Sequence, residues 1–120
     1  MSAGVTAKSG KLVAYLNVTP QQGDEKRKGF ANFRVNLNGE DHDKDVHLDA
    51  TAEGVRFRGG TGSCVVDDYH TRLGDNHYRE IACLVVGRHG GSVLVAAAAD
   101  ADWARFRPLL RQAVDSFAVS

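Results

Sequence analysis

The sequence predicts an α+β fold, in which helices pack on a twisted antiparallel β-sheet and the C-terminal helix lies across one face. Two observations lead to this class. Residues 63–69, 78–86 and 92–98 are β-rich and are separated only by turn-like connections, which predicts an antiparallel meander. After them, apolar residues recur at helical spacing from Trp103 to Phe117, which predicts one amphipathic helix.

Length and charge exclude several classes of protein. A chain of 120 residues is long enough for one core but not for two. Its 15 basic and 15 acidic residues balance, which gives no reason to expect nucleic acid as a partner. No segment approaches the roughly 20 apolar residues that span a bilayer. We expect residues 1–10, which are small and polar, to form a flexible leader, and residues 11–120 to form a single domain.

The N-terminal half predicts a strand followed by a helix. Polar and apolar residues alternate over residues 11–18, and Pro20 then interrupts the pattern. Asp24 is a suitable helix cap, and phenylalanine and leucine residues recur at three- and four-residue spacing after it, so we expect a helix over residues 25–37. The polar residues 38–45 are expected to be a loop.

Residues 44–54 are ambiguous between helix and strand. Val46, Leu48, Ala50 and Ala52 alternate as in a strand. The alanine and acidic content instead suits a short helix that ends at Gly54, and this is the prediction we adopt. A short strand over residues 55–57 should follow it.

The last helix should begin with Asp100 or Asp102 as its cap. Pro108 lacks a backbone donor, which predicts a kink or break near Arg107. One apolar stripe runs along the helix: Trp103, Phe106, Leu110, Ala113 or Val114, and Phe117.

The two cysteines come into register if the first hairpin of the meander turns between Leu73 and Gly74. Cys64 then lies opposite Cys83, at a separation that suits a disulfide. Favourable pairs flank them in the same register: Val66 with Ile81, Asp68 with Arg79, and Tyr69 with Tyr78. We predict a disulfide, which would place the domain in an oxidising compartment. The alternative is a pair of free thiols buried in a cytosolic core.

The same register places Asp67 opposite Glu80, where like charges face each other. Either the register slips near the turn, or the pair is solvated, or the two acids serve a function such as general acid–base chemistry. Asp67, Tyr69, Tyr78 and Glu80 share one sheet face, and we refer to them as the predicted polar cluster. They are the candidate polar groups of a pocket.

No metal, cofactor or catalytic residue is predicted. His70 faces His77 at the mouth of the hairpin, with Asp68 and Asp75 nearby, and a second group of histidine and aspartate spans residues 42–47. Neither group has the ligand number and spacing of a closed metal site. The chain also lacks a phosphate-binding loop and a nucleophile elbow.

The order of elements and the last helix resemble the PsbP-like family, which includes photosystem accessory proteins, a Ran-binding nuclear import factor and many bacterial lipoproteins. The resemblance covers residues 11–119 and is specific in the C-terminal sixty. It rests on Trp103, Phe106, Leu110, Ala113, Val114, Ser116, Phe117 and Val119. It implies an α/β/α sandwich and a role in binding or assembly, with no catalytic residue. The short N-terminal half and Pro108 depart from the family pattern.

The sequence therefore predicts a non-catalytic binding or accessory module that acts through a protein partner. We expect it to be extracytoplasmic, with its signal segment absent from this chain, and to be a monomer or weak dimer. The alternative is a small enzyme or ligand-binding domain with a pocket between sheet and helix. A pocket into which the predicted polar cluster converges would favour the alternative, and a filled core with those groups in solvent would favour the binding module.

Overall fold

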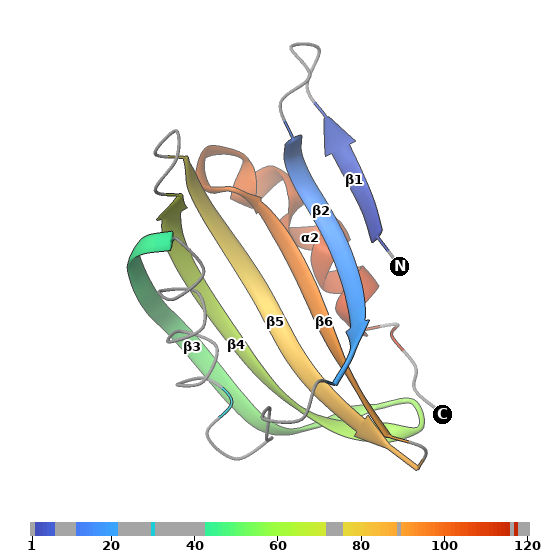
Figure 1. The fold of residues 1–120 in the computed structure, drawn as a ribbon. Helices are drawn as coiled ribbons and strands as arrows, with labels where there is room; N and C mark the ends of the chain where they lie inside the picture. The colour runs from blue at the N-terminus through green and yellow to red at the C-terminus, as the bar shows by residue number, and fades with distance from the viewer. Residues whose placement is uncertain are drawn as a thin grey trace.

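A six-stranded antiparallel sheet forms the body of the molecule (Figure 1). The computed structural model describes residues 2–6, 12–21, 30, 43–71, 76–88, 90–115 and 117. The strand order across the sheet is β1-β2-β6-β5-β4-β3, so the predicted meander β4–β5–β6 occupies its centre. The strands are β1 (Ser2–Thr6), β2 (Leu12–Pro20), β3 (Asp43–Phe57), β4 (Gly60–Thr71), β5 (His77–Gly87) and β6 (Gly90–Ala99).

The two central strands are buried on both faces. Residues 80–85 of β5 and residues 93–99 of β6 are all buried, and they are almost entirely apolar. A continuous apolar run of this length is typical of a strand that is covered on both sides. Both strands are apolar on both faces because each lies between two other strands and side chains pack above and below it.

One helix covers one face of the sheet. A single 3-10 turn, η1 (Asp100–Asp102), leads from β6 into α2 (Trp103–Asp115), which packs on β6 behind the sheet in Figure 1. The predicted stripe faces the sheet: Phe106, Leu110 and Val114 are buried, and Trp103 and Phe117 pack at the border of the same core. Phe117 also meets Phe57 edge-on, with 6.3 Å between the ring centroids.

Two details of the predicted helix differ. The expected break near Arg107 is wrong, because α2 continues through Pro108 to Asp115. Burial of the stripe on both sides of Pro108 compensates for the missing backbone donor. The helical segment also begins one residue earlier than an aspartate cap would place it, because Ala99 precedes η1 and makes no side-chain capping bond. Asp100 contacts side chains of β5 instead.

The opposite face carries a second apolar cluster. It contains Phe30, which has a helical backbone and is 1 % exposed, together with Val65, Ala82, Leu84, Val93 and Val95. The rest of the predicted helix at 25–37 lies outside the described residues. What the described residues support is an α+β fold of sheet plus one helix. The flanking α/β/α sandwich implied by the resemblance is therefore not supported.

The predicted helix at 44–54 is wrong, and so is the end of the predicted loop, residues 43–45. Both fall in β3, which begins at Asp43, pairs with β4 and forms an edge of the described sheet. Residues 38–42 of the predicted loop lie outside the described residues. Backbone pairing with β4 outweighs the helix-like composition, since strand formation depends on neighbours more than on intrinsic preference. Gly54 has φ +66° and lies within an irregularity of the pairing, not at a helix end.

The N-terminus also differs from expectation. Ser2–Thr6, which the sequence placed in a flexible leader, is the strand β1 and pairs antiparallel with β2 at the other edge of the sheet. None of the described helices is long and apolar enough to cross a membrane.

Candidate functional site

The β4–β5 hairpin has the predicted register along its length, from Gly60 opposite Gly87 to His70 opposite His77. Two hydrogen bonds of 2.9 Å join the ends of the two strands next to the turn. The amide of Thr71 donates to the carbonyl of Asn76, and the amide of Asn76 donates to Oγ1 of Thr71. The side chains that meet across the two strands are therefore those of the predicted register.

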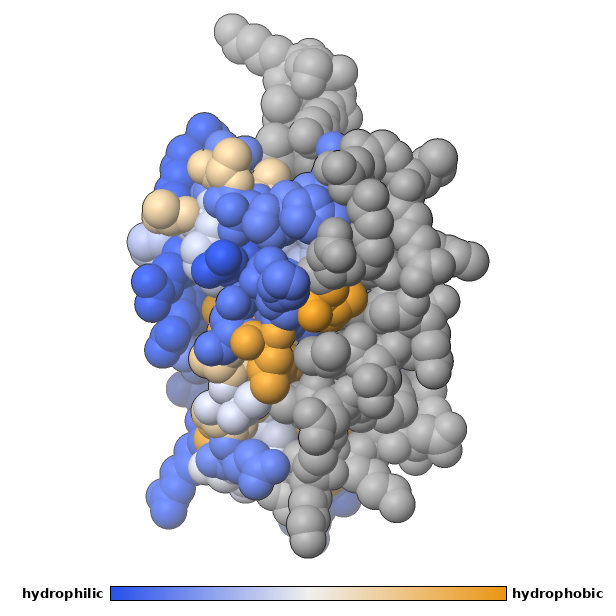
Figure 2. Space-filling view, turned by 90° about the vertical axis from the view of Figure 1, so that its left-hand side faces the viewer, coloured by the Kyte–Doolittle hydropathy of each residue, from blue (hydrophilic) through white to orange (hydrophobic). Residues whose placement is uncertain are grey.

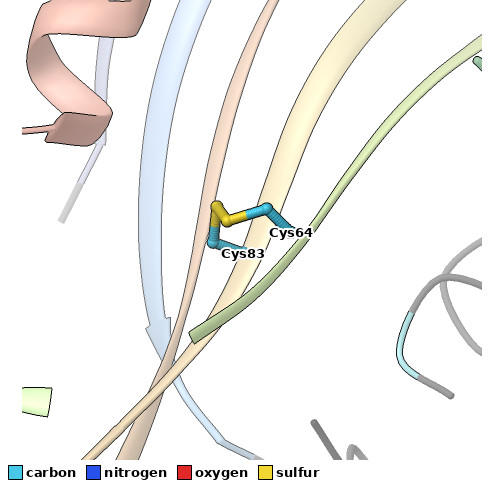
Figure 3. The surroundings of a disulfide bond; sticks show 2 residues. All are labelled: Cys64 and Cys83. Atoms are coloured by element: carbon cyan, nitrogen blue, oxygen red, sulfur yellow. A yellow bond between two sulfur atoms is a disulfide. The ribbon is translucent and has the colours of Figure 1, made fainter. Parts of the chain in front are cut away.

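The predicted disulfide joins Cys64 to Cys83. The sulfur atoms are 2.17 Å apart and the Cα atoms 4.1 Å apart, on directly opposed positions of β4 and β5 (Figure 3). Cys83 is fully buried and Cys64 is half-buried. Since the chain contains two cysteines, the bridge leaves no free thiol.

The predicted polar cluster lies on the sheet face opposite α2. Asp67 and Glu80 are directly opposed and are both 0 % exposed, so the register does not slip there and the pair is not solvated. Each of these two acids interacts with at least one other group. Tyr69 is buried, with its ring centroid 6.1 Å from that of Tyr78 and its hydroxyl 3.5 Å from the hydroxyl of Tyr15. The acid pair and the tyrosine pair thus lie near each other along this face of the hairpin.

A second polar cluster lies on the α2 face, near the hairpin turn. We call it the His77 cluster, and it consists of Asp49, Asp68, His77, Arg79 and Asp100. Nε2 of His77 is 3.0 Å from Oδ1 of Asp68, and its Nδ1 is 3.5 Å from Oδ2 of Asp100. The guanidinium Nε of Arg79 is 3.1 Å from Oδ1 of Asp100. Arg79 also lies 4.0 Å from a carboxylate oxygen of both Asp68 and Asp49.

Four structural elements contribute to the His77 cluster. Asp68 comes from β4, His77 and Arg79 from β5, Asp49 from β3 and Asp100 from η1. Asp49 has no partner position in the β3–β4 pairing, because Leu48 pairs with Asp67 and the next residue to pair is Ala50. An irregularity of this kind is a common way to redirect a side chain. Only the Asp68–Arg79 and His70–His77 pairs of this region were visible in the predicted register.

The pKa values of Asp49 and Asp68 are shifted in opposite directions. Burial raises the pKa of Asp49 above its ordinary value of 3.8, and so do hydrogen bonding to Asp68 and the charge of Asp68, against the opposing charges of Arg79 and His47. Burial would also raise the pKa of Asp68. Hydrogen bonds from His77 and Asp49, and the charges of His47 and Arg79, outweigh that effect and lower the pKa of Asp68. The pair therefore holds its first proton on Asp49.

The histidines of this region stack rather than form a metal-binding set. The rings of His70 and His77 are 4.3 Å apart and inclined by 14°. Within the part of the chain that the structure describes, no group of three His, Cys, Asp or Glu side chains is arranged to hold a metal ion. Asp75, which the sequence placed near His70 and His77, lies outside the described residues. In the second predicted group, His42 also lies outside them, and His47 is exposed on β3.

A groove of about 430 Å³ opens between β3, β4 and the C-terminal half of α2. Its lining is largely apolar and includes Ala50, Ala52, Val55, Cys64, Val66 and Val114. Three charged residues also border it: Arg56, Arg111 and Asp115. Figure 2 views the molecule from the β3 side and shows hydrophobic side chains gathered within a mainly hydrophilic surface. None of the residues of the predicted polar cluster lines this groove.

Sequence reasoning did not find this groove or two members of the His77 cluster. Asp49 and Asp100 reach the cluster through β3 pairing and through the turn after β6, respectively. One signal for Asp100 was present: Ala99 pairs with Tyr78, so the residue after β6 emerges beside His77. No local pattern marks Asp49, because its position depends on an irregularity in long-range pairing.

The chain has the fold of the PsbP-like proteins. The likeness to one solved structure shows this. It is the solution structure of the cyanobacterial PsbP, CyanoP, from Synechocystis sp. PCC 6803, which is 15% identical with a TM-score of 0.60 over 99% of this chain and 82% of that one. The chain is also similar to the crystal structure of PA94 from Pseudomonas aeruginosa, a protein of unknown function suggested to be a regulator, which is 11% identical with a TM-score of 0.70 over 100% of this chain and 82% of that one.

At these identities the likeness shows the fold alone. No family model matches the chain, and no curated protein sequence matches it. A function for this chain must therefore be inferred from its own residues.

Proposed function

We propose that this domain is a non-catalytic accessory module that binds a protein partner in an oxidising, extracytoplasmic compartment. One observation carries the proposal. The groups that were candidates for catalysis and the hollow that would accept a substrate lie apart: Asp67 and Glu80 are buried in the sheet, whereas the groove has a largely apolar lining. A catalytic pocket instead brings its polar groups to the bound ligand.

The His77 cluster supports the same conclusion. Its histidine and arginine are engaged by three carboxylates, and no serine, threonine or cysteine belongs to it. A nucleophile next to a base, oriented by a third group, is the arrangement that covalent catalysis needs. The described contacts instead tie β3, β4, β5 and η1 together.

The disulfide supports the proposed compartment. Disulfides persist in oxidising environments and are rare where glutathione and thioredoxin keep thiols reduced. Source cells should be quenched with acid, and the protein then unfolded and treated with a polyethylene-glycol maleimide. We expect no mass shift without reductant and the addition of two maleimides after reduction. Two additions without reductant would place the protein in a reducing compartment.

Exposed leucines offer a way to test the protein partner. Leu48 on β3 is 47% exposed and Leu109 on α2 is 58% exposed, whereas most large apolar side chains of the described residues are buried. Apolar side chains near the centre of an interface supply much of its binding free energy. Cross-linking in source cells should identify a partner that forms a stoichiometric complex with the purified chain.

The matched variants are Leu48→Arg and Leu109→Arg. Both positions are exposed, so neither change should affect folding. At least one should weaken the reconstituted complex more than tenfold, while Gln112→Arg, at another exposed position of α2, serves as the control. If the purified chain forms no stoichiometric complex, or if it turns over a substrate without a partner, the proposal is wrong.

A further inference from the structure

A trough on the α2 face of the sheet lies open between α2 and the edge strand β3. It consists of the groove described above and of a second hollow on α2, which is lined by Ala104, Arg107, Pro108 and Arg111. Arg111 borders both hollows, so they join along the helix. We propose that an amphipathic helix of the protein partner docks in this trough, beside α2. This inference rests on the proposed function and names the surface through which the partner binds.

The floor of the trough is an apolar part of the sheet. Ala50 pairs with Val66, and Ala52 pairs with Cys64. Val66 and Cys64 pack against the core that α2 covers, so the two alanines opposite them also point to the α2 face. The alanines are exposed, and Val66 and Cys64 are half-buried. Figure 1 shows α2 behind β6 and no helix behind β3. The apolar face of a docked helix would remove this surface from water.

The spacing of the strands leaves room for one more helix. α2 packs on β6, and β4 lies two strands away from β6 in the sheet. Neighbouring strands are about 4.8 Å apart, so β4 lies about 10 Å from β6. Packed helices are separated by about 8–10 Å, so a helix over β4 would contact the floor and α2 at once. α2 borders the trough from Ala104 to Asp115. At 1.5 Å per residue this is about 16 Å, the length of about three turns of a docked helix.

An extended segment of the partner suits this edge of the sheet less well than a helix does. β3 is an edge strand, and its pairing with β4 is interrupted at three places, the last of them between Ala52 and Val55. Irregularities of this kind twist an edge strand and disturb the regular row of backbone donors and acceptors that an added strand needs. The partner should therefore bind by packing side chains on the face, as amphipathic helices do in apolar grooves.

The charges of α2 favour acidic residues on the docked helix. Ala104, Pro108, Arg111 and Asp115 lie on one flank of α2 at helical spacing, with Arg107 beside them. Neither arginine forms an ion pair with another residue that the structure describes. Two arginines and one aspartate give this flank a net charge of +1. Because a guanidinium binds a carboxylate through two parallel hydrogen bonds, a docked helix should place an acidic residue opposite each arginine.

The trough is compatible with the role proposed for the exposed leucine of α2. An interface of standard size covers about 800 Å² of each protein. Such an area is large enough to extend from the trough over α2 to Leu109, which is exposed.

Photo-crosslinking of the full chain in source cells tests the site. p-Benzoylphenylalanine is placed at position 52, on the floor, or at position 51. Thr51 pairs with Val65 of the second apolar cluster, so its side chain points to the opposite face. We expect position 52 to crosslink to a segment of the partner that has apolar residues at helical spacing and acidic residues along one edge. Position 51 is equally exposed and should not crosslink to that segment.

A synthetic peptide of the crosslinked segment then tests the binding mode with the purified, oxidised chain. Circular dichroism should show that the peptide gains helix on binding. Ala52→Trp should fill the floor and weaken binding at least about tenfold, whereas Thr51→Trp should not. Arg107→Glu and Arg111→Glu should each weaken binding about tenfold, and a peptide with Lys in place of the facing acidic residue should restore it. Arg105→Glu is the matched control, because Arg105 is exposed and borders neither hollow. All five positions are exposed, so melting curves of the free variants should stay close to that of the parent.

A stoichiometric complex that forms without a crosslink from position 52 would overturn the docking site and leave the proposed function intact. The absence of any complex would overturn both. Crosslinks from position 52 to a second copy of this chain alone would assign the trough to self-association. Unchanged peptide binding by Ala52→Trp, or by both Glu variants, would place the segment elsewhere. A peptide that gains no helix, or that binds as tightly with a central proline, would show that the docked segment is not a helix.

Discussion

His77 and Asp68 form a 3.0 Å contact between imidazole Nε2 and carboxylate Oδ1, across the strands β4 and β5. The other ring nitrogen of the same imidazole faces Asp100 at 3.5 Å, where the chain leaves the sheet for α2. One side chain therefore links the hairpin to the start of the helical segment. The ion pairs of the His77 cluster therefore connect elements that are distant in the sequence.

Replacing Asp68 by Asn should destabilise the fold at neutral pH. The change removes a charged hydrogen-bond acceptor from His77 and the countercharge of Arg79, and a bond to a charged group contributes about 1.5–3 kcal/mol. Urea unfolding would measure the loss, with Asp102→Asn on η1 as control. Because the pKa of Asp68 is lowered in the fold, its contribution is present above the unfolded value of 3.8 and is lost as pH falls below it. The parent and Asp68→Asn should therefore converge in acid, and a constant difference down to pH 2 would contradict the assignment.

Replacing Asp49 by Asn should have the opposite sign. The pKa of Asp49 is raised in the fold, so the folded state binds its proton more tightly than the unfolded state does, and stability falls as pH rises above 3.8. At neutral pH a neutral amide removes that penalty. The Asp49 side chain is 30% exposed, so solvent screening limits the gain to under about 1 kcal/mol. Urea midpoints at pH 7 and pH 3 test this, and a loss of stability at pH 7 would show that Asp49 acts mainly as a partner of Arg79.

Removal of the disulfide should cost about 3 kcal/mol. The bridge closes a loop between residues 19 apart, and a loop of this length gives that figure on the chain-entropy model. The double variant Cys64→Ala, Cys83→Ala is the appropriate test, because it leaves neither a free thiol nor a buried hydroxyl. Thiol titration of the unfolded, unreduced parent should find none, and two reactive thiols would rule out the bridge in solution.

The hairpin could be predicted because its information is local. A turn-like centre and three complementary pairs within about twenty residues predict the register, and cross-strand pairing then places the cysteines opposite each other. The C-terminal helix was predictable for a similar reason, since its stripe repeats over several turns. In both cases the residues that specify the element are close in sequence.

β3 could not be assigned in this way, because its strand character comes from pairing with β4. The apolar pattern did contain one indication of a bulged strand. The alternation up to Ala52 resumes at Val55, an odd step, and Gly54 with positive φ lies between them. An interrupted alternation around a glycine is typical of a bulged strand. The groove depends on that bulge and on the position of α2, so neither element alone predicts it.

Leu109 and Leu110 are adjacent on α2 but should respond very differently to truncation. Leu110 is 6% exposed within the core that the helix shares with β5 and β6, whereas Leu109 is 58% exposed. Leu110→Ala removes buried methyl groups and leaves a cavity, which costs about 2–5 kcal/mol. Leu109→Ala removes the same atoms and makes the same change in helix propensity. It should nevertheless alter the free energy of unfolding by no more than about 0.5 kcal/mol.

Urea unfolding of the two variants separates docking of α2 from its intrinsic helicity, since both lose the same side chain from the same helix. Phe117→Ala should fall between them, because its ring is half-buried and packs edge-on against Phe57. The slope of the unfolding transition should stay constant across the three, which indicates an unchanged native surface. Equal midpoints for Leu109→Ala and Leu110→Ala would mean that the apolar stripe of α2 does not face the sheet.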